Sequence, residues 1–368
     1  MRFLNRNVRK PNKEVISSKR AFWQPVIFAL LLGVFSLTAC TSKEDAEAVQ
    51  KGYEFLEEPD YTSAEQSFRQ AIDSKSDLAM AYRGLGICLM NKGEYEEAID
   101  AFKEALANSG ATPSKMDYDV NYYMGVCFHK LGQYKEAKER YDAIIALKSR
   151  EVDAYMQRGA EYLYLKDVDS ACTDFDKALS LKKKDFTLYI DIYNLLAETG
   201  YQSYGADYLN EALQKYNRNM SDYDKGYINY CLGNYPTAKD YLEQARTGGN
   251  KSEEVLLLLG KCYEELDDTA FAITIYSKYL ETEPDAGVYN QLAVALIDQG
   301  RYEEALDAVV NGLELDANEC RQELLYNRIV AYEHLAQFDK ARDLCAQYLV
   351  DYPSDEDMAR EYNFLKTR

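Results

Sequence analysis

Residues 79–106 read AMAYRGLGICLMNKGEYEEAIDAFKEAL, and the spacing of small and aromatic residues in this stretch returns along most of the chain. Gly86 and Ala98 supply the small residues, and Phe102 follows them as the aromatic one. A fixed period of about 34 residues indicates a stack of helix pairs, because one such pair cannot bury its apolar face alone. The stretch therefore predicts a repeat protein built from helices.

The register of this repeat can be followed by counting from Ala79. Small residues stand at positions 8 and 20 and an aromatic residue at position 24, while apolar residues recur at the three- and four-residue intervals of a helix. The small residues let two antiparallel helices approach closely, and the aromatic side chain fills the space beside them. The register places nine units, which begin at Asp45, Ala79, Tyr118, Val152, Phe186, Asn219, Glu253, Ala286 and Gln322.

The fifth and sixth units follow the register less well than the others. Tyr193 replaces the small residue at position 8 of the fifth unit, and Asn229 stands where an apolar residue is usual in the sixth. Each unit of a stack contacts its neighbours alone, so a weak unit loosens the stack locally. We therefore expect bending or looser packing in this region.

This register resembles that of the tetratricopeptide repeat (TPR) family, over nearly all of the chain that follows the first 39 residues. In the second unit the family's characteristic positions hold Tyr82, Leu85, Gly86, Leu89, Gly93, Tyr95, Ala98, Phe102 and Ala105. Pro284 and Pro353 stand between units, where proline cannot continue the preceding helix. The resemblance implies an all-α, right-handed superhelical solenoid of about nine TPR helix pairs over residues 45–353. Residues 354–368, which are charged, are expected to form a C-terminal capping helix.

Residues 1–39 have the composition of a leader peptide. Basic residues precede an apolar run of about 14 residues, VIFALLLGVFSLTA, which is too short for an ordinary membrane-spanning helix and suits the core of a secretion signal. The run ends in LTAC, which resembles the bacterial lipobox. This resemblance implies cleavage before Cys40, lipidation of Cys40, and a short tether over residues 40–44. A plain signal peptide with an incidental cysteine and an uncleaved signal anchor are the alternatives.

The charge of the chain is strongly acidic. Of the 43 basic and 62 acidic residues, seven basic and one acidic lie in the leader, which leaves a net charge of −25 after cleavage. Such a surface repels nucleic acid phosphates, whose binding needs clustered lysine and arginine. We expect a protein or peptide partner that is neutral or basic, no nucleic acid, and a membrane contact through the lipid anchor. Acidity that serves solubility alone is the simpler explanation.

Residues that could perform catalysis are sparse. The two histidines, His129 and His334, are separated by about six repeats, and no common catalytic, nucleotide-binding or metal-binding motif is present. Seven cysteines follow Cys40 without a disulfide pattern, and Cys88, Cys127 and Cys262 occupy the same position of their units. We therefore expect no enzyme, no cofactor and no metal site.

The remaining candidate site is the concave face, which the first helix of each unit lines in TPR proteins. Positions 2, 5, 9, 12 and 13 of those helices include Tyr53, Arg83, Tyr122, His129, Tyr164, Tyr223, Tyr227, Tyr230, Lys261, Tyr326 and His334. Of these, the candidates for binding in the groove are Arg83, Tyr122, Tyr223, Tyr227, Tyr230 and Tyr326. Aromatic rings with polar tips suit peptide contacts, although tyrosine also packs between helices. The Lys, Asn and Arg arrangement by which some TPR domains hold a terminal carboxylate is not seen at these positions.

Together these features predict a membrane-tethered TPR scaffold that mediates protein–protein interactions at the bacterial cell envelope. The expected location is the outer face of the cell membrane, or the outer membrane if the source has two. The alternative is a surface receptor or accessory lipoprotein that binds a peptide or sugar for a transporter or secretion system.

Overall fold

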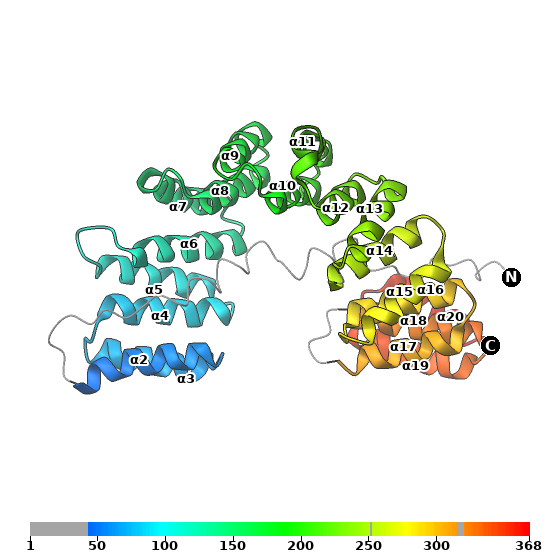
Figure 1. Ribbon diagram of the computed structural model, residues 1–368. Helices are drawn as coiled ribbons and strands as arrows, with labels where there is room; N and C mark the ends of the chain where they lie inside the picture. Colours follow the sequence, from blue (N-terminus) through cyan, green and yellow to red (C-terminus); the bar gives the residue numbers. More distant parts are fainter. Residues whose placement is uncertain (1–42, 251, 316–319) are drawn as a thin grey trace. The chain divides into compact units, whose positions relative to one another are not determined.

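A computed structural model describes residues 43–250, 252–315 and 320–368, whose regular elements are all helices, with no β-strand among them (Figure 1). The predicted leader and Cys40 lie outside the described residues. Within those residues, no helix combines the length and the apolar character that crossing a membrane requires. The described chain divides into two compact units, which are called here the N-terminal unit (residues 43–208) and the C-terminal unit (residues 209–368).

The N-terminal unit contains four complete helix pairs and most of a fifth. Each helix packs against the next one in the chain, and α4 also contacts α2 and α6. Its helices are α2 (Lys43–Glu57), α3 (Tyr61–Asp73), α4 (Leu78–Asn91), α5 (Tyr95–Ala107), α6 (Lys115–Lys130), α7 (Tyr134–Leu147), α8 (Val152–Tyr164), α9 (Val168–Leu181) and α10 (Phe186–Glu198). The helix α11 (Gln202–Tyr216) contains the division between the two units.

The C-terminal unit continues the same alternation from the end of α11. A short 3-10 helix, η3 (Asn217–Asn219), precedes the next pairs. These are α12 (Asp222–Cys231), α13 (Tyr235–Thr247), α14 (Glu253–Glu265), α15 (Thr269–Leu280), α16 (Ala286–Asp298), α17 (Tyr302–Leu313), α18 (Arg321–His334), α19 (Phe338–Asp351) and the unpaired last helix α20 (Glu356–Leu365). The expected all-α class with nine helix pairs and a further C-terminal helix is therefore confirmed.

The glycine and the aromatic residue of the register pack together as the sequence predicts. Phe68 on α3 is fully buried, and a methyl group added at Gly52 or Gly84 would lie within 2.6 or 2.2 Å of its ring. Gly86 and Phe102 make the corresponding contact in the next pair, where the distance would be 2.5 Å. Because such distances leave no room for a side chain, the small residues set how closely the two helices approach.

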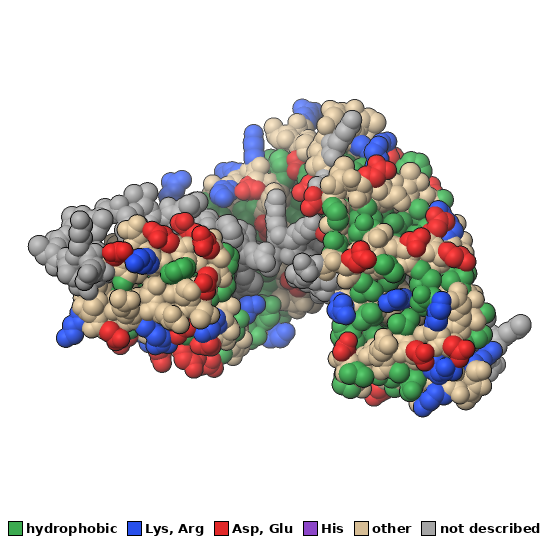
Figure 2. All heavy atoms as spheres, turned by 90° about the horizontal axis from the view of Figure 1, so that it is seen from below, with side chains coloured by type: hydrophobic (Ala, Val, Ile, Leu, Met, Phe, Trp, Pro, Cys, Tyr) green, Lys and Arg blue, Asp and Glu red, His purple; other side chains and the backbone are tan. Residues whose placement is uncertain are grey.

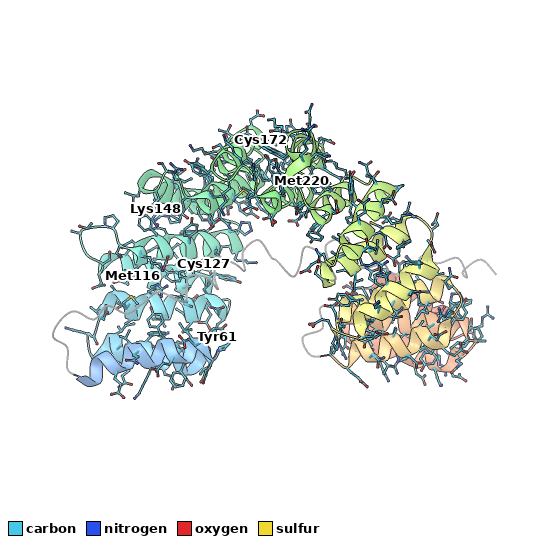
Figure 3. The ribbon with its side chains drawn as sticks, in the orientation of Figure 1. Tyr61, Met116, Cys127, Lys148, Cys172 and Met220 are labelled. Atoms are coloured by element: carbon cyan, nitrogen blue, oxygen red, sulfur yellow. The ribbon has the colours of Figure 1, made fainter. Side chains whose placement is uncertain are left out.

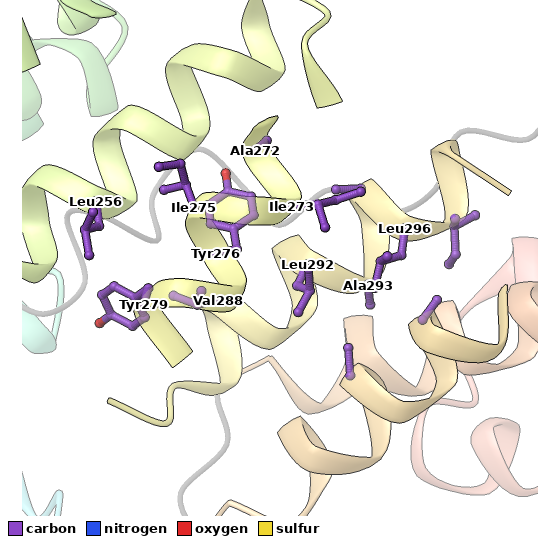
Figure 4. Close-up of a cluster of buried hydrophobic side chains, with 14 of the residues drawn as sticks. Leu256, Ala272, Ile273, Ile275, Tyr276, Tyr279, Val288, Leu292, Ala293 and Leu296 are labelled. Atoms are coloured by element: carbon purple, nitrogen blue, oxygen red, sulfur yellow. The ribbon is translucent and has the colours of Figure 1, made fainter. Parts of the chain in front are cut away.

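The apolar core is divided among the pairs rather than gathered in one place. Figure 4 shows the part of it that α14, α15 and α16 share, where Leu296 lies beside Ala293. Tyr276 and Ala293 are fully buried. The last helix α20 buries Met358 and Leu365 against α18 and α19. The end of the stack thus has its apolar face covered, as a solenoid in water requires.

Ionic contacts join consecutive repeats in addition to the apolar core. Arg158 on α8 donates to both carboxylate oxygens of Asp174 over 2.8 and 2.6 Å, and to Asp142 of the preceding repeat over 2.7 Å. Asp174 is 3% exposed, so this arginine neutralises a buried charge. Charge-assisted bonds of this two-pronged kind are stronger than neutral hydrogen bonds.

The region predicted to be weak contains the division between the two units, which falls inside the second helix of the fifth repeat. Tyr193 is buried there, and Gly205 on α11 lies against it, where an added methyl group would be 3.0 Å from the tyrosine backbone. The usual pair is thus reversed, with the large residue on the first helix and the glycine on the second. Whether this makes the region softer stays a prediction.

Candidate functional site

The first helices of the N-terminal unit carry a row of polar residues that pair with one another. Arg83 on α4 donates from Nη1 to the Tyr53 hydroxyl on α2 over 3.0 Å, and its Nη2 lies 3.5 Å from Asp119 Oδ2 on α6. The guanidinium carbon also lies 5.6 and 5.7 Å from the ring centres of Tyr53 and Tyr123. Arg83 is 6% exposed. This candidate for groove binding is therefore used in contacts between repeats and presents little surface to a ligand. We name Tyr53, Arg83 and Asp119 the N-terminal row.

Two further candidates, Tyr122 and Tyr326, are also largely buried. Tyr122 packs beside Tyr141 with 6.0 Å between ring centres, and burial raises its pKa well above the usual range. Tyr326 belongs to the cluster under the last helices of the chain. Each is 7% exposed, and each therefore offers little surface to a partner.

The other three candidates lie together on α12. Tyr223 and Tyr227 are 6.0 Å apart between ring centres, and Tyr230 lies 5.7 Å from Tyr235 at the start of α13. All three are half-buried and pack with one side against the core of the C-terminal unit. A ring that is held on one side and exposed on the other can add contact area to a ligand with little loss of rotamer freedom. The structure thus brings together the tyrosine stripe that the sequence predicts.

The histidines are held in separate surroundings. His129 Nδ1 lies 3.0 Å from Glu161 Oε1 on α8, and its ring packs edge-on against Tyr164 at 4.8 Å. Burial raises the pKa of Glu161, although the hydrogen bond from the histidine opposes this. His334 stacks on Tyr302 at 4.6 Å, and burial lowers its pKa. Each histidine serves packing within its own unit.

The described cysteines are all free thiols. Cys127 lies on α6 and Cys172 on α9 (Figure 3). Burial raises the pKa of Cys127 and of Cys345 to about 12, which keeps these thiols protonated and unreactive near neutral pH. Across the described ranges, no group of three or more histidine, cysteine or acidic side chains is arranged to hold a metal ion.

Charged side chains of both signs lie side by side on the face that Figure 2 shows. On the face of the molecule that Figure 2 shows, acidic and basic side chains of the described residues are interspersed with hydrophobic ones. Many of the exposed pairs join residues three or four positions apart in the chain, such as Arg301 at the N-cap of α17 with Glu304 at 2.6 Å. Pairs of this kind contribute little to stability and leave the overall negative charge in place.

One residue at the predicted inner positions is buried and has a lowered pKa, which the sequence did not reveal. Lys261 on α14 is 6% exposed, and burial lowers its pKa to about 8. Further along, Asn290 on α16 and Asn327 on α18 are fully buried, with 2.8 Å between Asn327 Nδ2 and Asn290 Oδ1. The register could have pointed to this group, because Lys261 and Asn290 stand at the same positions as Tyr53 and Arg83.

Comparison with known proteins gives matches along most of the described chain. Family models described as tetratricopeptide repeat match residues 49–113, 119–147, 152–185, 254–286 and 290–356, which together are more than half of the sequence. A TPR repeat-containing protein of Methanocaldococcus jannaschii is 26% identical over 259 residues, covering 67% of this chain and 43% of that protein. The DnaJ homolog subfamily C member 7 homolog of Schizosaccharomyces pombe is 26% identical over 350 residues, covering 89% and 68%.

Solved structures align with this chain at lower identity. A tetratricopeptide repeat protein from Parabacteroides merdae aligns with a TM-score of 0.48 and 18% identity, covering 77% of this chain and 99% of that one. The chain spans less than half the length of several of the curated relatives that it matches.

Proposed function

The chain belongs to the tetratricopeptide repeat family, and from this premise we propose that it is a binding scaffold that recruits a protein or peptide through the first helices of its repeats. The observation that carries the proposal is the tyrosine stripe on α12, where Tyr223, Tyr227 and Tyr230 are each held on one side and exposed on the other. A repeat stack presents such a surface over many helices at once, which suits an extended partner better than a small substrate.

The charge of the chain supports a neutral or basic partner. The mature chain would carry a net charge of −25, and opposite charge on a partner would speed its encounter with this surface. Such binding should weaken as salt is added, because screening shortens the reach of the field to about 8 Å at physiological ionic strength. If the affinity does not change with salt concentration, the apolar contacts of the tyrosines are its main source.

A cross-linking experiment in living cells tests this proposal. A photo-reactive residue placed at Tyr227 should capture a partner, because that side chain is half-exposed on the first helix of its repeat. The matched control places the same residue at Val350, which is 79% exposed on α19, the second helix of its pair. The same set of proteins captured from both positions would count against recognition by the tyrosine stripe.

We further propose that the chain is exported and held on a membrane through lipid on Cys40, at the cell envelope. The support is the leader composition and the sequence LTAC at residues 37–40. One acyl chain holds a protein marginally while two or three hold it stably, since each buried methylene contributes about 0.8 kcal/mol.

Cell fractionation of Cys40→Ser tests the anchor. The unaltered chain should sediment with membranes and require detergent for release, whereas Cys40→Ser should lose this attachment. Cys172→Ser, which alters a partly exposed thiol elsewhere, should behave as the unaltered chain does. If Cys40→Ser remains bound to membranes as firmly as its control, the anchor must lie elsewhere.

A further inference from the structure

The loops that join one repeat to the next lie along one edge of the N-terminal unit. Lys148, at the end of α7 (Figure 3), lies with its Nζ 3.7 Å from the ring centre of Tyr118 at the start of α6. Gly159 on α8 lies against Phe175 on α9, so the end of α9 lies beside the start of α8. The start of α6, the loop between α7 and α8 and the loop between α9 and α10 therefore share this edge.

This edge of the N-terminal unit is rich in basic residues. Six exposed ones, which we name the basic edge, are Lys115, Lys148, Arg150, Lys182, Lys183 and Lys184. Four acidic residues lie between them in the same segments, namely Asp117, Glu151, Asp153 and Asp185. Asp117 and Asp185 are held in the caps of α6 and α10, and among the described residues only Lys182 forms an ion pair, at 3.8 Å from Asp185. The edge therefore keeps a positive charge.

The loops between repeats share an edge of the C-terminal unit as well. Gly312, near the end of α17, is close enough to the start of α16 that an added methyl group would lie 3.0 Å from Tyr289 Cβ. The Tyr348 hydroxyl, on α19, accepts a hydrogen bond from Gln322 at the start of α18 over 2.9 Å and donates one to Asp355 at the N-cap of α20 over 2.8 Å. The loops that precede α16, α18 and α20 therefore lie along one edge.

This edge of the C-terminal unit is acidic. Six exposed residues, which we name the acidic edge, are Glu281, Glu283, Glu314, Asp351, Glu356 and Asp357. The segments 281–285, 314–315 and 351–357 contain no lysine or arginine, although Lys278 and Arg321 lie in the adjoining helix turns. Among the described residues, only Asp357 of the acidic edge forms an ion pair, with Arg360. The two units thus carry opposite charge on equivalent edges.

Each edge also holds one exposed aliphatic side chain in an equivalent place. Leu147 ends α7 directly before Lys148, and Val350 lies at the end of α19 directly before Asp351. Their exposed fractions are 60% and 79%, the two highest among the large hydrophobic side chains that the structure describes. A single exposed apolar residue is common on a protein surface, but one set within a line of like charges can be buried when the opposite line docks on it.

We propose that the chain forms a symmetric dimer in which the basic edge of each copy meets the acidic edge of the other. Leu147 of one copy then packs against Val350 of its partner, with the charged residues around this contact. A two-fold dimer repeats each contact twice, so both edges of both copies are used. This inference goes beyond the proposed function, because the loop edges are distinct from the tyrosine stripe on α12.

A second copy of the chain fits these observations better than an unrelated acidic protein. An unrelated partner would engage the basic edge alone and leave the acidic edge and Val350 exposed. The chain has a net charge of −19, so two copies repel each other in most orientations. Orientations that place a basic edge against an acidic one escape this repulsion, which makes the pairing specific.

Reversing the charge of one edge tests the dimer. The first variant carries Lys182→Glu, Lys183→Glu and Lys184→Glu, and the second carries Glu281→Lys, Glu283→Lys and Asp351→Lys. Two tagged copies of the full chain, kept in a mild non-ionic detergent because of the apolar run in the leader, should co-purify when unaltered. Each variant should co-purify with itself about tenfold less or worse, because like charges then face each other.

A matched control reverses the same number of lysines on the opposite edge. Lys130→Glu, Lys135→Glu and Lys166→Glu change exposed residues at the turns within the third and fourth repeats. This control should co-purify with itself as the unaltered chain does. Circular dichroism of each variant confirms that it is folded, so that lost association is not mistaken for lost structure.

Mixing the two variants provides the decisive readout. The reversed edges of the first and second variants are complementary to each other, and so are their unaltered edges, so the mixture should regain the co-purification that each variant lacks alone. A contact between the two edges within one chain could not be restored in this way. Failure of the mixture to associate, or equal association of every variant, would overturn the inference and leave the proposed function standing.

Discussion

Lys261→Met should make the C-terminal unit more stable, because it removes a charge whose burial outweighs the attraction of Glu264 and Glu265. The folded state lowers the pKa of this lysine from 10.5 to about 8. A tenfold change in proton affinity corresponds to about 1.36 kcal/mol, so at neutral pH the charged lysine costs the fold about 3 kcal/mol. Because the side chain is only 6% exposed, solvent screening reduces this cost little.

The dependence on pH has a definite sign. A folded-state pKa below the unfolded value means that the folded chain binds the proton more weakly, so the penalty is complete below about pH 8 and disappears as the pH rises past 10.5. Urea unfolding of both proteins should therefore show the largest difference near neutral pH and a smaller one at alkaline pH. Lys278→Met, at an exposed position, should differ little from the unaltered chain at either pH.

Two results would refute this reasoning. If Lys261→Met unfolds at a lower urea concentration than the unaltered chain near neutral pH, the lysine has a stabilising partner. A difference that stays constant between neutral and alkaline pH would show that packing, and not charge, is responsible.

Three further predictions concern the stability of the repeats and the reactivity of the thiols. Arg158→Met should lower the free energy of unfolding by about 3 kcal/mol, because it leaves the buried Asp174 without its positive partner. Arg301→Met breaks an exposed pair and should lower the free energy of unfolding by less than about 1 kcal/mol. Equal losses for the two variants in urea unfolding would contradict this prediction. Phe68→Ala should cost about 3–5 kcal/mol because the ring is fully buried between two glycines, and a change below about 1 kcal/mol in the same assay would exclude that packing. Iodoacetamide should alkylate the partly exposed Cys172 in the native protein and Cys345 only after unfolding, which mass spectrometry can measure. Equal alkylation rates for the two thiols in the native protein would mean that Cys345 is accessible.

The repeat architecture could be predicted from the sequence because its determinants are local and periodic. A glycine at position 8 and an aromatic residue at position 24 lie on the two helices of one pair, so their contact needs no knowledge of distant parts of the chain. The structure confirms this contact for Gly86 with Phe102 and for Gly52 with Phe68. The pattern is strict because a side chain at the glycine would overlap the ring.

The state of the inner residues could not be predicted in the same way. Positions 9, 5 and 2 belong to three different repeats, so their pairing depends on the length of each side chain and on how the repeats pack. Arg83 and Asn290 have the same register position. Arg83 donates a hydrogen bond to Tyr53 of the preceding repeat, whereas Asn290 Nδ2 forms no hydrogen bond among the described residues. The three tyrosines of the predicted stripe lie together in the structure because they share one helix, α12. Tyr122 and Tyr326, which lie on other helices, are packed into the core.

Recognition through the tyrosine stripe can be measured as the affinity of the purified protein for the partner captured at Tyr227. Isothermal titration should show that Tyr227→Ser weakens this binding about tenfold or more, because the half-exposed ring supplies contact area to the partner. Val350→Ser, at an exposed site on α19, should leave the affinity unchanged. If the two variants bind the partner as tightly as the unaltered chain, the tyrosine stripe is not the recognition surface.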